Sequence, residues 1–330
     1  MISRTSIKYF SRSDVRKCLS VRRAIDLMKD AFVLLVNNKA VVPQRTHLDI
    51  LESNGTELIK PVYIPGYKLI GFKVISLFKD NPSIGLPNSH ALMMLFDATN
   101  GQALAIMDGD YLTAVRTGAA SGLATDLLAR KDSEACVIFG AGPQGEKQLE
   151  AVNIVRPLKK SYIVDKNIEK AKSFAWKMSQ SLNISVEVGN EREMLKNVDI
   201  ICTATTSSEP VFSDKYLKTG VHINGVGSFK QDTREIPSET VLRAKVVVDQ
   251  KEACLSEAGD IVIPIKEGVF GENIIYGEIG EIISGIKAGR ESESEITFFK
   301  SVGNAVQDLV VAREVFEFGK ENDLGIHLET

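Results

Sequence analysis

Three glycines at fixed spacing are the residues whose chemistry is easiest to read in this chain. Gly140, Gly142 and Gly145 form a G-x-G-x-x-G pattern between an apolar run at residues 135–139 and a helix-like pattern. The first glycine permits a tight turn, the second lets backbone approach a pyrophosphate, and the third lets helix pack on strand. The helix N-terminus adds unpaired N–H groups and a partial positive charge. Because both flanks are present, the pattern predicts a dinucleotide site.

An acidic residue at the end of the next predicted strand completes this site. Asp165 ends the run SYIVD, 25 positions after Gly140. A carboxylate about 20 residues beyond the glycines accepts the ribose hydroxyls of NAD and repels a 2′-phosphate. Lys166 follows directly and could soften that preference, so NAD is expected and NADP stays open. The alternative is an ordinary aspartate at a strand end.

A further strand ends in Thr203, Ala204 and Thr205. Ligands of parallel α/β sheets bind outside the carboxyl ends of the strands, so this segment should line the cofactor. The alternative is a plain transition from strand to loop. The full set of expected cofactor-binding residues is Gly140, Gly142, Pro143, Gln144, Gly145, Asp165, Lys166, Thr203, Ala204, Thr205, Val226, Gly227 and Ser228.

Three basic residues, Arg45, Lys73 and Arg116, lie in apolar surroundings. Lys73 stands out, because a lysine within GFKVISLF needs a partner or a function. Arg116 lies on a predicted helix among Ala, Gly and Thr, which leave room for a small anion, and a guanidinium can bind a carboxylate with two parallel hydrogen bonds. Internal salt bridges or snorkelling side chains are the alternative, and the residues alone leave both open.

The elements that carry these cations predict an α+β first domain. An amphipathic helix at 20–38, with Ser20 as N-cap, precedes strands within 41–51, 58–78, 90–97 and 102–107. These elements predict a mostly antiparallel sheet covered by the first helix. A helix rich in small residues at 111–129 leads into the second half of the chain.

Strands and helices alternate from residue 135 onward, which predicts a doubly wound parallel sheet. The expected strands are 135–139, 161–165, 184–188, 200–204, 222–226, 245–249 and 296–299, and the expected helices are 144–155, 168–181 and 191–196. We expect the last helix, 304–321, to return to the first domain. The fold class is therefore α/β: a Rossmann-type domain at 116–302 inserted in an α+β domain formed by 1–115 and 303–330.

Composition narrows the functional class. The chain has 330 residues, of which 44% are hydrophobic and 25% charged, as in globular proteins, and a net charge of −3 gives no reason to expect nucleic acid. The four cysteines show no C-x-x-C spacing, which favours buried free thiols and no metal site. No apolar run has the length of a membrane span or a signal-peptide core. A cytoplasmic enzyme fits this composition.

The chain resembles the ornithine cyclodeaminase/mu-crystallin family over nearly its full length. The matching stretches are GFKVIS, LPNSHALMMLFD, MDGDYLTAVRTGAASGLAT, IFGAGPQGEKQLEAV, INGVGS, GEIGEIISG and FKSVGNAVQDLVVA. The resemblance implies a homodimer whose first domain binds substrate and forms the subunit contact, and an NAD(P)-binding Rossmann domain in the middle of the chain. It also implies that Arg45, Lys73 and Arg116 form the substrate site, with the arginines on the substrate carboxylate.

The family includes several activities, and one position bears on the choice among them. In the family that this chain resembles, the cyclodeaminases and a related archaeal alanine dehydrogenase have an aspartate shortly after the INxxG segment. Here Phe229 takes that position, and Asp232 follows three residues later. An amine that must lose a proton needs a base, whereas an imine awaiting reduction needs an acid. The resemblance therefore implies an NAD(P)H-dependent reductase of a cyclic 2-carboxy imine such as Δ1-pyrroline-2-carboxylate.

Three other activities remain open at this point. An ornithine cyclodeaminase would use NAD+ catalytically, and an alanine dehydrogenase would act on a linear amino acid. A mu-crystallin-like protein would bind a small ligand without turnover. In the reductase, Lys73 would donate a proton or a hydrogen bond to a small amino-acid-derived substrate with a carboxylate.

Overall fold

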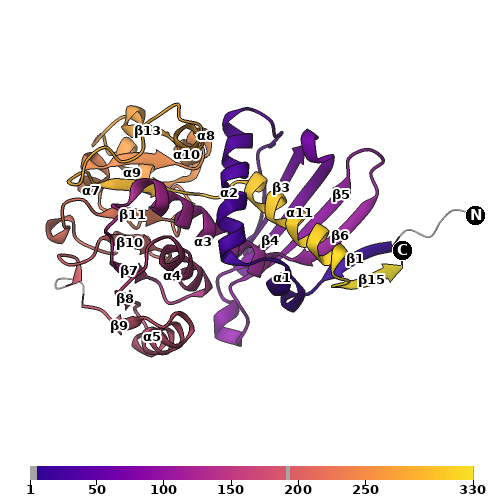
Figure 1. Cartoon of the computed structure of the whole chain (residues 1–330), viewed down its shortest axis with the longest axis horizontal. Helices are drawn as coiled ribbons and strands as arrows, with labels where there is room; N and C mark the ends of the chain where they lie inside the picture. The colour runs from indigo at the N-terminus through magenta and orange to yellow at the C-terminus, as the bar shows by residue number, and fades with distance from the viewer. Residues whose placement is uncertain (1–5, 191–193, 330) are drawn as a thin grey trace, which may run out of the picture. The chain divides into compact units, whose positions relative to one another are not determined.

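The chain folds into two compact units, each with its own sheet (Figure 1). The computed structural model describes residues 6–190 and 194–329. Unit 1 comprises Met1–Arg116 and Asn304–Thr330, and unit 2 comprises Thr117–Gly303. The sequence-based boundaries lie one residue before these. The boundary at residue 116 falls within one continuous helix, α3 (Gly109–Leu128).

Unit 1 is built on a seven-stranded sheet in the order β15-β1-β6-β5-β4-β3-β2. Its strands are β1 (Ser6–Phe10), β2 (Thr46–Ile50), β3 (Gly55–Ile64), β4 (Leu69–Phe78), β5 (Ser89–Asp97), β6 (Ala103–Asp108) and β15 (Ile326–Glu329). All neighbours pair antiparallel except β1 and β6, which confirms the predicted mostly antiparallel sheet. The sequence interpretation missed the two short terminal strands, β1 and β15.

The helices of unit 1 are arranged differently from the prediction. They are α1 (Arg12–Cys18), α2 (Val21–Val36), the first part of α3, and α11 (Ala305–Glu321). Ser20 caps α2 by accepting from the Arg23 N–H, as predicted. However, α11 packs directly on β3, β4 and β5, and α2 packs against α11 (Figure 1). The expectation that the first helix covers the sheet is therefore wrong. Most residues of α11 are buried, so this helix lies between the sheet and α2.

Unit 2 is built on a parallel sheet in the order β13-β12-β14-β11-β10-β7-β8-β9. Its strands are β7 (Ala135–Phe139), β8 (Lys160–Val164), β9 (Ser185–Val188), β10 (Ile200–Thr203), β11 (His222–Gly225), β12 (Lys245–Val248), β13 (Ile275–Glu278) and β14 (Thr297–Lys300). Its helices are the rest of α3, α4 (Pro143–Val155), α5 (Ile168–Leu182), α7 (Ser238–Arg243), α8 (Lys251–Glu257), α9 (Gly259–Lys266) and α10 (Ile279–Ile283). The predicted helix at 191–196 begins outside the described residues.

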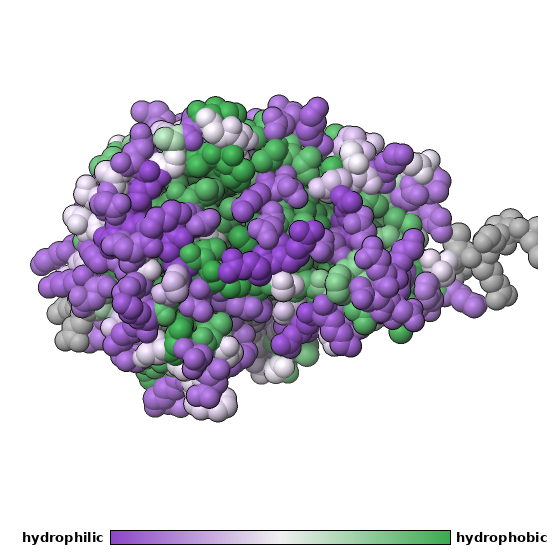
Figure 2. Space-filling model, in the orientation of Figure 1, coloured by the Kyte–Doolittle hydropathy of each residue, from purple (hydrophilic) through white to green (hydrophobic). Residues whose placement is uncertain are grey.

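Apolar side chains cover both faces of this parallel sheet. Along β7, Val137 and Phe139 belong to one apolar cluster, whereas Cys136 and Ile138 belong to the other. Because successive side chains of a strand point to opposite faces, the two clusters lie on opposite sides of the sheet. This confirms the predicted doubly wound sheet. The surface drawn in Figure 2 is mostly hydrophilic, with apolar side chains between the polar ones.

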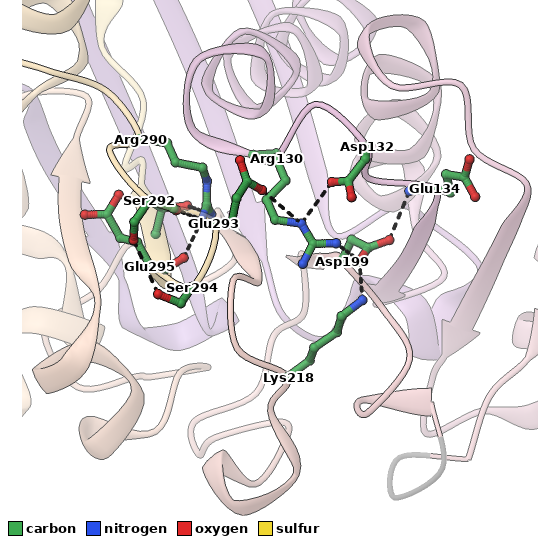
Figure 3. Close-up of polar contacts among 12 residues, drawn as sticks. Arg130, Asp132, Glu134, Asp199, Lys218, Arg290, Ser292, Glu293, Ser294 and Glu295 are labelled. Atoms are coloured by element: carbon green, nitrogen blue, oxygen red, sulfur yellow. Dashed lines mark hydrogen bonds and ion pairs between the residues drawn. The ribbon is translucent and has the colours of Figure 1, made fainter.

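Asp199 ties together the amino ends of the central strands (Figure 3). Its Oδ2 accepts from the Glu134 and Ala135 N–H groups at 3.0 and 3.1 Å, and its Oδ1 accepts from Arg130 and Lys218 at 3.0 and 2.6 Å. Burial raises the pKa of Asp199, but the Lys218 ammonium and the backbone donors outweigh burial and hold it below the usual value. This network lies at the amino ends of β7 and β10, whereas the glycine loop follows the carboxyl end of β7.

In the described part of the chain, no helix is long and apolar enough to cross a membrane. Within the same residues, no group of three or more histidine, cysteine or acidic side chains is arranged to hold a metal ion.

Candidate functional site

Lys73 lies on the inner face of the unit 1 sheet, beneath α11. It occupies β4 opposite Lys60 of β3 and Met93 of β5, and its side chain is fully buried. Its Nζ donates to Asp308 Oδ1 at 2.6 Å and to Thr113 Oγ1 at 3.2 Å. The alternation of β4 places Lys73 inward, so burial forces it to find a partner. α11 supplies that partner.

Arg116 meets the same carboxylate from the middle of α3. Its Nε donates to Asp308 Oδ1 at 2.9 Å, and its Nη1 donates to Gln307 Oε1 at 2.8 Å. Gln307 also closes the capping box of α11 with Asn304, which fixes the first turn of that helix. One carboxylate oxygen therefore holds two of the three predicted cations together.

The charges of this cluster tune one another. Burial lowers the pKa of Lys73 to about 7, although the Asp308 carboxylate opposes it and Arg116 and Arg45 reinforce it. Burial raises the pKa of Asp308, but the charges of Arg116, Lys73 and Lys60 outweigh burial and hold it below the usual value. A lysine that titrates near neutral pH can act as an acid or a base in that range.

Arg45 and Lys60 complete the basic group around Asp308. Arg45 is half-buried in the segment before β2, close enough for its charge to lower the pKa of both Lys60 and Lys73. Burial, followed by the charge of Lys73, holds the pKa of Lys60 well below the usual range of a lysine. We call Arg45, Lys60, Lys73, Arg116 and Asp308 the basic cluster.

Two atoms of the basic cluster region have unused hydrogen-bonding capacity. Asp308 Oδ2 and Gln307 Nε2 are buried and have no hydrogen-bond partner. Buried polar atoms are nearly always paired, so an unpaired acceptor and an unpaired donor on adjacent residues call for water or a ligand. The sequence interpretation missed Asp308, Gln307, Thr113 and Lys60. The available signal was an acid within the apolar helix run AVQDLVVA.

The glycine loop of unit 2 has the geometry that a pyrophosphate site needs. Gly140 has φ of 105°, and a Cβ there would meet the Ala204 carbonyl oxygen at 2.5 Å. Gly142 is the N-cap of α4, and a Cβ there would meet nothing within 4 Å. Because α4 has no side-chain cap and Pro143 opens it, the N–H groups of its first turn are available to an anion. These residues fit a dinucleotide phosphate.

Asp165 lies directly beside this loop, after β8. Its Oδ2 accepts from the Ala141 N–H at 2.8 Å, and its Oδ1 accepts from the Asn167 N–H at 2.8 Å. The structure therefore brings Asp165 to the glycine loop, and Lys166 beside it is exposed. Both oxygens also have lone pairs left for further donors such as ribose hydroxyls.

The segments after β10 and β11 are organised by a residue that the sequence interpretation missed. Glu235, fully buried, accepts from Thr205 and from the Gly227 and Ser228 N–H groups, and from Thr203. The hydroxyls of Thr203 and Thr205 and these N–H groups thus point to Glu235. Burial, followed by the charge of Asp260, raises the pKa of Glu235.

Phe229 occupies the position after the INxxG segment where the resemblance places an aspartate in the cyclodeaminases. Phe229 is partly buried and packs against the apolar cluster of unit 2. Asp232 is exposed in the turn that follows. Neither residue is part of the basic cluster.

The fold and the two sites define the class of this protein: a two-unit α/β protein with a glycine loop on a doubly wound parallel sheet and a buried basic cluster in the other unit. The sequence profile of the ornithine cyclodeaminase/mu-crystallin family matches residues 7–323. The chain belongs to this family.

Relatives in this family match nearly the whole chain. A Δ1-pyrroline-2-carboxylate reductase of Bacillus cereus is 40% identical over 321 residues, which are 97% of this chain and 98% of the relative. The structure of Thermococcus litoralis Δ1-pyrroline-2-carboxylate reductase in complex with NADH and L-proline is 44% identical, with a TM-score of 0.95 over 98% of this chain and 100% of that one. An archaeal alanine dehydrogenase dimer with bound NAD is 33% identical, with a TM-score of 0.92 over 98% and 99%.

Proposed function

We propose that the chain is an NAD(P)H-dependent reductase of cyclic 2-carboxy imines, with Δ1-pyrroline-2-carboxylate as substrate and L-proline as product. The observation that carries the proposal is Lys73, a buried lysine with a pKa of about 7 held by Asp308 among further basic residues. The two reductases at 40% and 44% identity support the choice of substrate. The basic cluster suits a substrate that carries a carboxylate and a basic nitrogen.

Unit 2 holds the cofactor in this proposal. Gly140, Gly142, Pro143, Gln144 and Gly145 bind the pyrophosphate through backbone groups and the α4 N-terminus. Asp165 binds the ribose hydroxyls and favours NADH over NADPH, while Lys166 donates to the 2′-phosphate when NADPH binds. The segments 203–205 and 226–228 line the remainder. When bound, the reduced nicotinamide supplies the hydride.

The residues of unit 1 bind the imine and manage its proton. Arg45 and Arg116 hold the carboxylate, which orients the C=N bond, and this orientation is a large part of the catalysis. Lys73 donates a proton to the nitrogen as hydride reaches the carbon, so the π bond is replaced by one C–H and one N–H bond. Lys73 is left neutral, a form that burial favours. Asp308 accepts from both Lys73 and Arg116 and so fixes the two side chains relative to each other for this step.

The family's other activities give different products, and one assay separates them. Purified protein is given NADH or NADPH with Δ1-pyrroline-2-carboxylate, Δ1-piperideine-2-carboxylate, or pyruvate plus ammonia, and oxidation is followed at 340 nm. Ornithine with NAD+ is tested in parallel for ammonia release. The proposal expects stoichiometric NADH oxidation with the pyrroline carboxylate.

Ammonia release from ornithine without net change in NADH would identify a cyclodeaminase instead. Turnover with pyruvate and ammonia alone would identify an alanine dehydrogenase. Binding without turnover of any of these compounds would indicate a small-ligand binder. The exposed position of Asp232 and the packing of Phe229 favour the reductase, because neither supplies the base that an amine substrate needs.

We further propose that the protein is a homodimer that pairs through the outer face of the unit 1 sheet. On that face Ile59, Tyr63 and Leu92 are 38%, 37% and 48% exposed, and cross-strand register places them beside other apolar residues of β4 and β5. A contiguous apolar face of this kind marks an interaction surface, and one relative is a dimer. Sedimentation of the wild type and Leu92→Glu tests it: a monomeric wild type would contradict the proposal.

A cytoplasmic location is the last part of the proposal. All four cysteines, Cys18, Cys136, Cys202 and Cys254, are free and buried. Free thiols persist in reducing compartments.

A further inference from the structure

Five hydrogen bonds converge on the carboxylate of Glu235, at the carboxyl edge of the unit 2 sheet. Oε1 accepts from the Thr205 N–H at 2.6 Å and the Thr205 hydroxyl at 2.7 Å. Oε2 accepts from the Thr203 hydroxyl at 2.9 Å and from the Gly227 and Ser228 N–H groups at 2.8 and 3.2 Å. One side chain therefore joins the segments that end two neighbouring strands, β10 and β11.

A buried network holds Glu235 itself in place. The N–H groups of Glu235 and Ile236 donate to Asp260 Oδ1 at 2.6 and 3.0 Å. Asp260 Oδ2 accepts from Lys300 Nζ at 2.7 Å, and Lys300 is the last residue of β14. All these groups are fully buried. The position of Glu235 is thus set by the sheet core, independently of solvent.

The segments that Glu235 fixes adjoin the glycine loop. The Ala204 carbonyl and the Thr205 methyl group are the atoms that a Cβ at Gly140 would meet, at 2.5 and 3.3 Å. A Cβ at Gly227 would meet both carboxylate oxygens of Glu235 at 2.5 Å. Close contacts therefore connect Glu235 through Thr205 to the turn of the glycine loop. A shift of the 203–205 segment would displace that turn.

We propose that Glu235 is a positioning residue for the dinucleotide, fixing the segments 203–205 and 227–228 in the one arrangement that NADH binding requires. Only an ionised carboxylate can accept all five bonds. A glutamine amide would turn its own N–H groups toward donors, and an aspartate is one methylene shorter. The inference rests on the proposed function only in requiring that NADH binds to unit 2.

NADH affinity tests the proposal without any imine. Binding is measured by the fluorescence of NADH with wild type, Glu235→Gln and Glu239→Gln, and thermal unfolding is recorded for each. Glu239 is exposed in α7, four residues away, and serves as the matched control. We expect Glu235→Gln to raise the NADH Kd about ten-fold or more, because several paired donors lose their acceptor. Glu239→Gln should leave the Kd within about two-fold.

A second variant removes one bond while keeping the side-chain shape. Thr203 is fully buried and its hydroxyl donates to Glu235, so Thr203→Val removes that one bond. We expect it to raise the Kd about three-fold in the wild-type background and to have no effect in the Glu235→Gln background, because the two changes disrupt the same contact.

The outcomes are distinct. A folded Glu235→Gln protein that binds NADH within two-fold of wild type would overturn the inference and leave the proposed reductase untouched. If Glu235→Gln does not fold, Thr203→Val decides: an unchanged Kd overturns the inference, and a raised Kd supports it. A wild type that binds neither NADH nor NADPH would overturn the proposed function and this inference together.

Discussion

Two buried lysine–aspartate pairs, one in each unit, have nearly the same geometry and different surroundings. Lys73 and Asp308 lie 2.6 Å apart in unit 1, and Lys300 and Asp260 lie 2.7 Å apart in unit 2. All four side chains are fully buried. A buried pair alone is weak evidence for function, since its Coulomb attraction is largely offset by desolvation. The neighbours of each pair decide what it does.

In the pair of unit 2, which we call closed, both aspartate oxygens have hydrogen-bond partners. In the pair of unit 1, which we call open, one aspartate oxygen has none. Asp260 and Glu235 use their oxygens on Lys300, backbone N–H groups and hydroxyls. In the basic cluster, Asp308 faces several basic side chains, and its Oδ2 has no partner. Surplus positive charge and an unused acceptor are what an anionic, nitrogen-bearing substrate would satisfy. Complete satisfaction is what a scaffold requires.

Truncating each lysine should separate these roles, with the largest expected effect in unit 1. Lys73→Met should lower kcat by about 10²- to 10⁴-fold, the usual contribution of a positioned acid, while leaving the NADH Kd unchanged. Lys300→Met leaves the Asp260 charge unpaired in the core, so it should destabilise the fold by about 3–5 kcal/mol. Steady-state kinetics, NADH titration and thermal unfolding measure the three quantities.

Lys79→Met serves as the control for both variants, since Lys79 is exposed just after β4. It should behave as wild type in all three measurements. Equal losses of kcat in Lys73→Met and Lys300→Met, at equal stability, would remove the distinction between the two pairs.

Arg116→Lys should have the next largest effect, on substrate binding rather than on turnover. The charge remains, but a lysine lacks the planar guanidinium that bonds Asp308 and Gln307 and can still present further donors to a substrate carboxylate. We expect the KM for the imine to rise about 10- to 100-fold, with the KM for NADH unchanged. Arg130→Lys in unit 2, where Arg130 bonds Asp132 and Asp199 outside the basic cluster, is the matched control. If the KM for NADH rises and the KM for the imine does not, Arg116 does not bind the substrate carboxylate.

The sequence predicted seven of the eight strands of the unit 2 sheet, because these strands carry local signals, and it missed β13 and the short helices α7, α8, α9 and α10. Short apolar runs bounded by turns, such as β7 and β10, end within a residue of the predicted positions. The strands β1 and β15 were missed because β15 is exposed throughout and β1 alternates buried with more exposed residues, so neither gives an apolar run. The covering of the sheet by α11 was missed because packing between segments about 200 residues apart leaves no trace in local periodicity.

The candidate sites divide in the same way. The glycine loop is a contiguous motif, so Gly140 and Gly142 could be assigned a role from spacing alone. Lys73 and Arg116 could be singled out as charges in apolar runs, but their shared partner could not, because Asp308 lies 235 and 192 residues away. Glu235 was missed for the same reason: its function depends on donors from two strand ends that only the sheet brings together.

Asp308→Asn should have the smallest effect on rate and the most specific effect on pH dependence. The pKa of Lys73, about 7, is a balance in which burial lowers it and Asp308 raises it. Lys73 donates its proton, so the reductase should be active below that pKa and lose activity as pH rises through about 7. Replacing the carboxylate by an amide removes the main raising influence, so the pKa of Lys73 falls and activity should be lost at lower pH.

The charged groups facing Lys73 all favour this direction of change. Lys60 of β3, Arg116 of α3 and Arg45 before β2 are basic, so no second acid of the basic cluster replaces Asp308. At pH 7 the rate should fall, because a smaller share of Lys73 is then protonated, and it should recover toward pH 6. Asp308→Glu, which keeps the charge, should keep the wild-type profile. Superimposable pH profiles for wild type and Asp308→Asn would show that Lys73 is not the proton donor, and the open pair in unit 1 would then be as structural as the closed pair in unit 2.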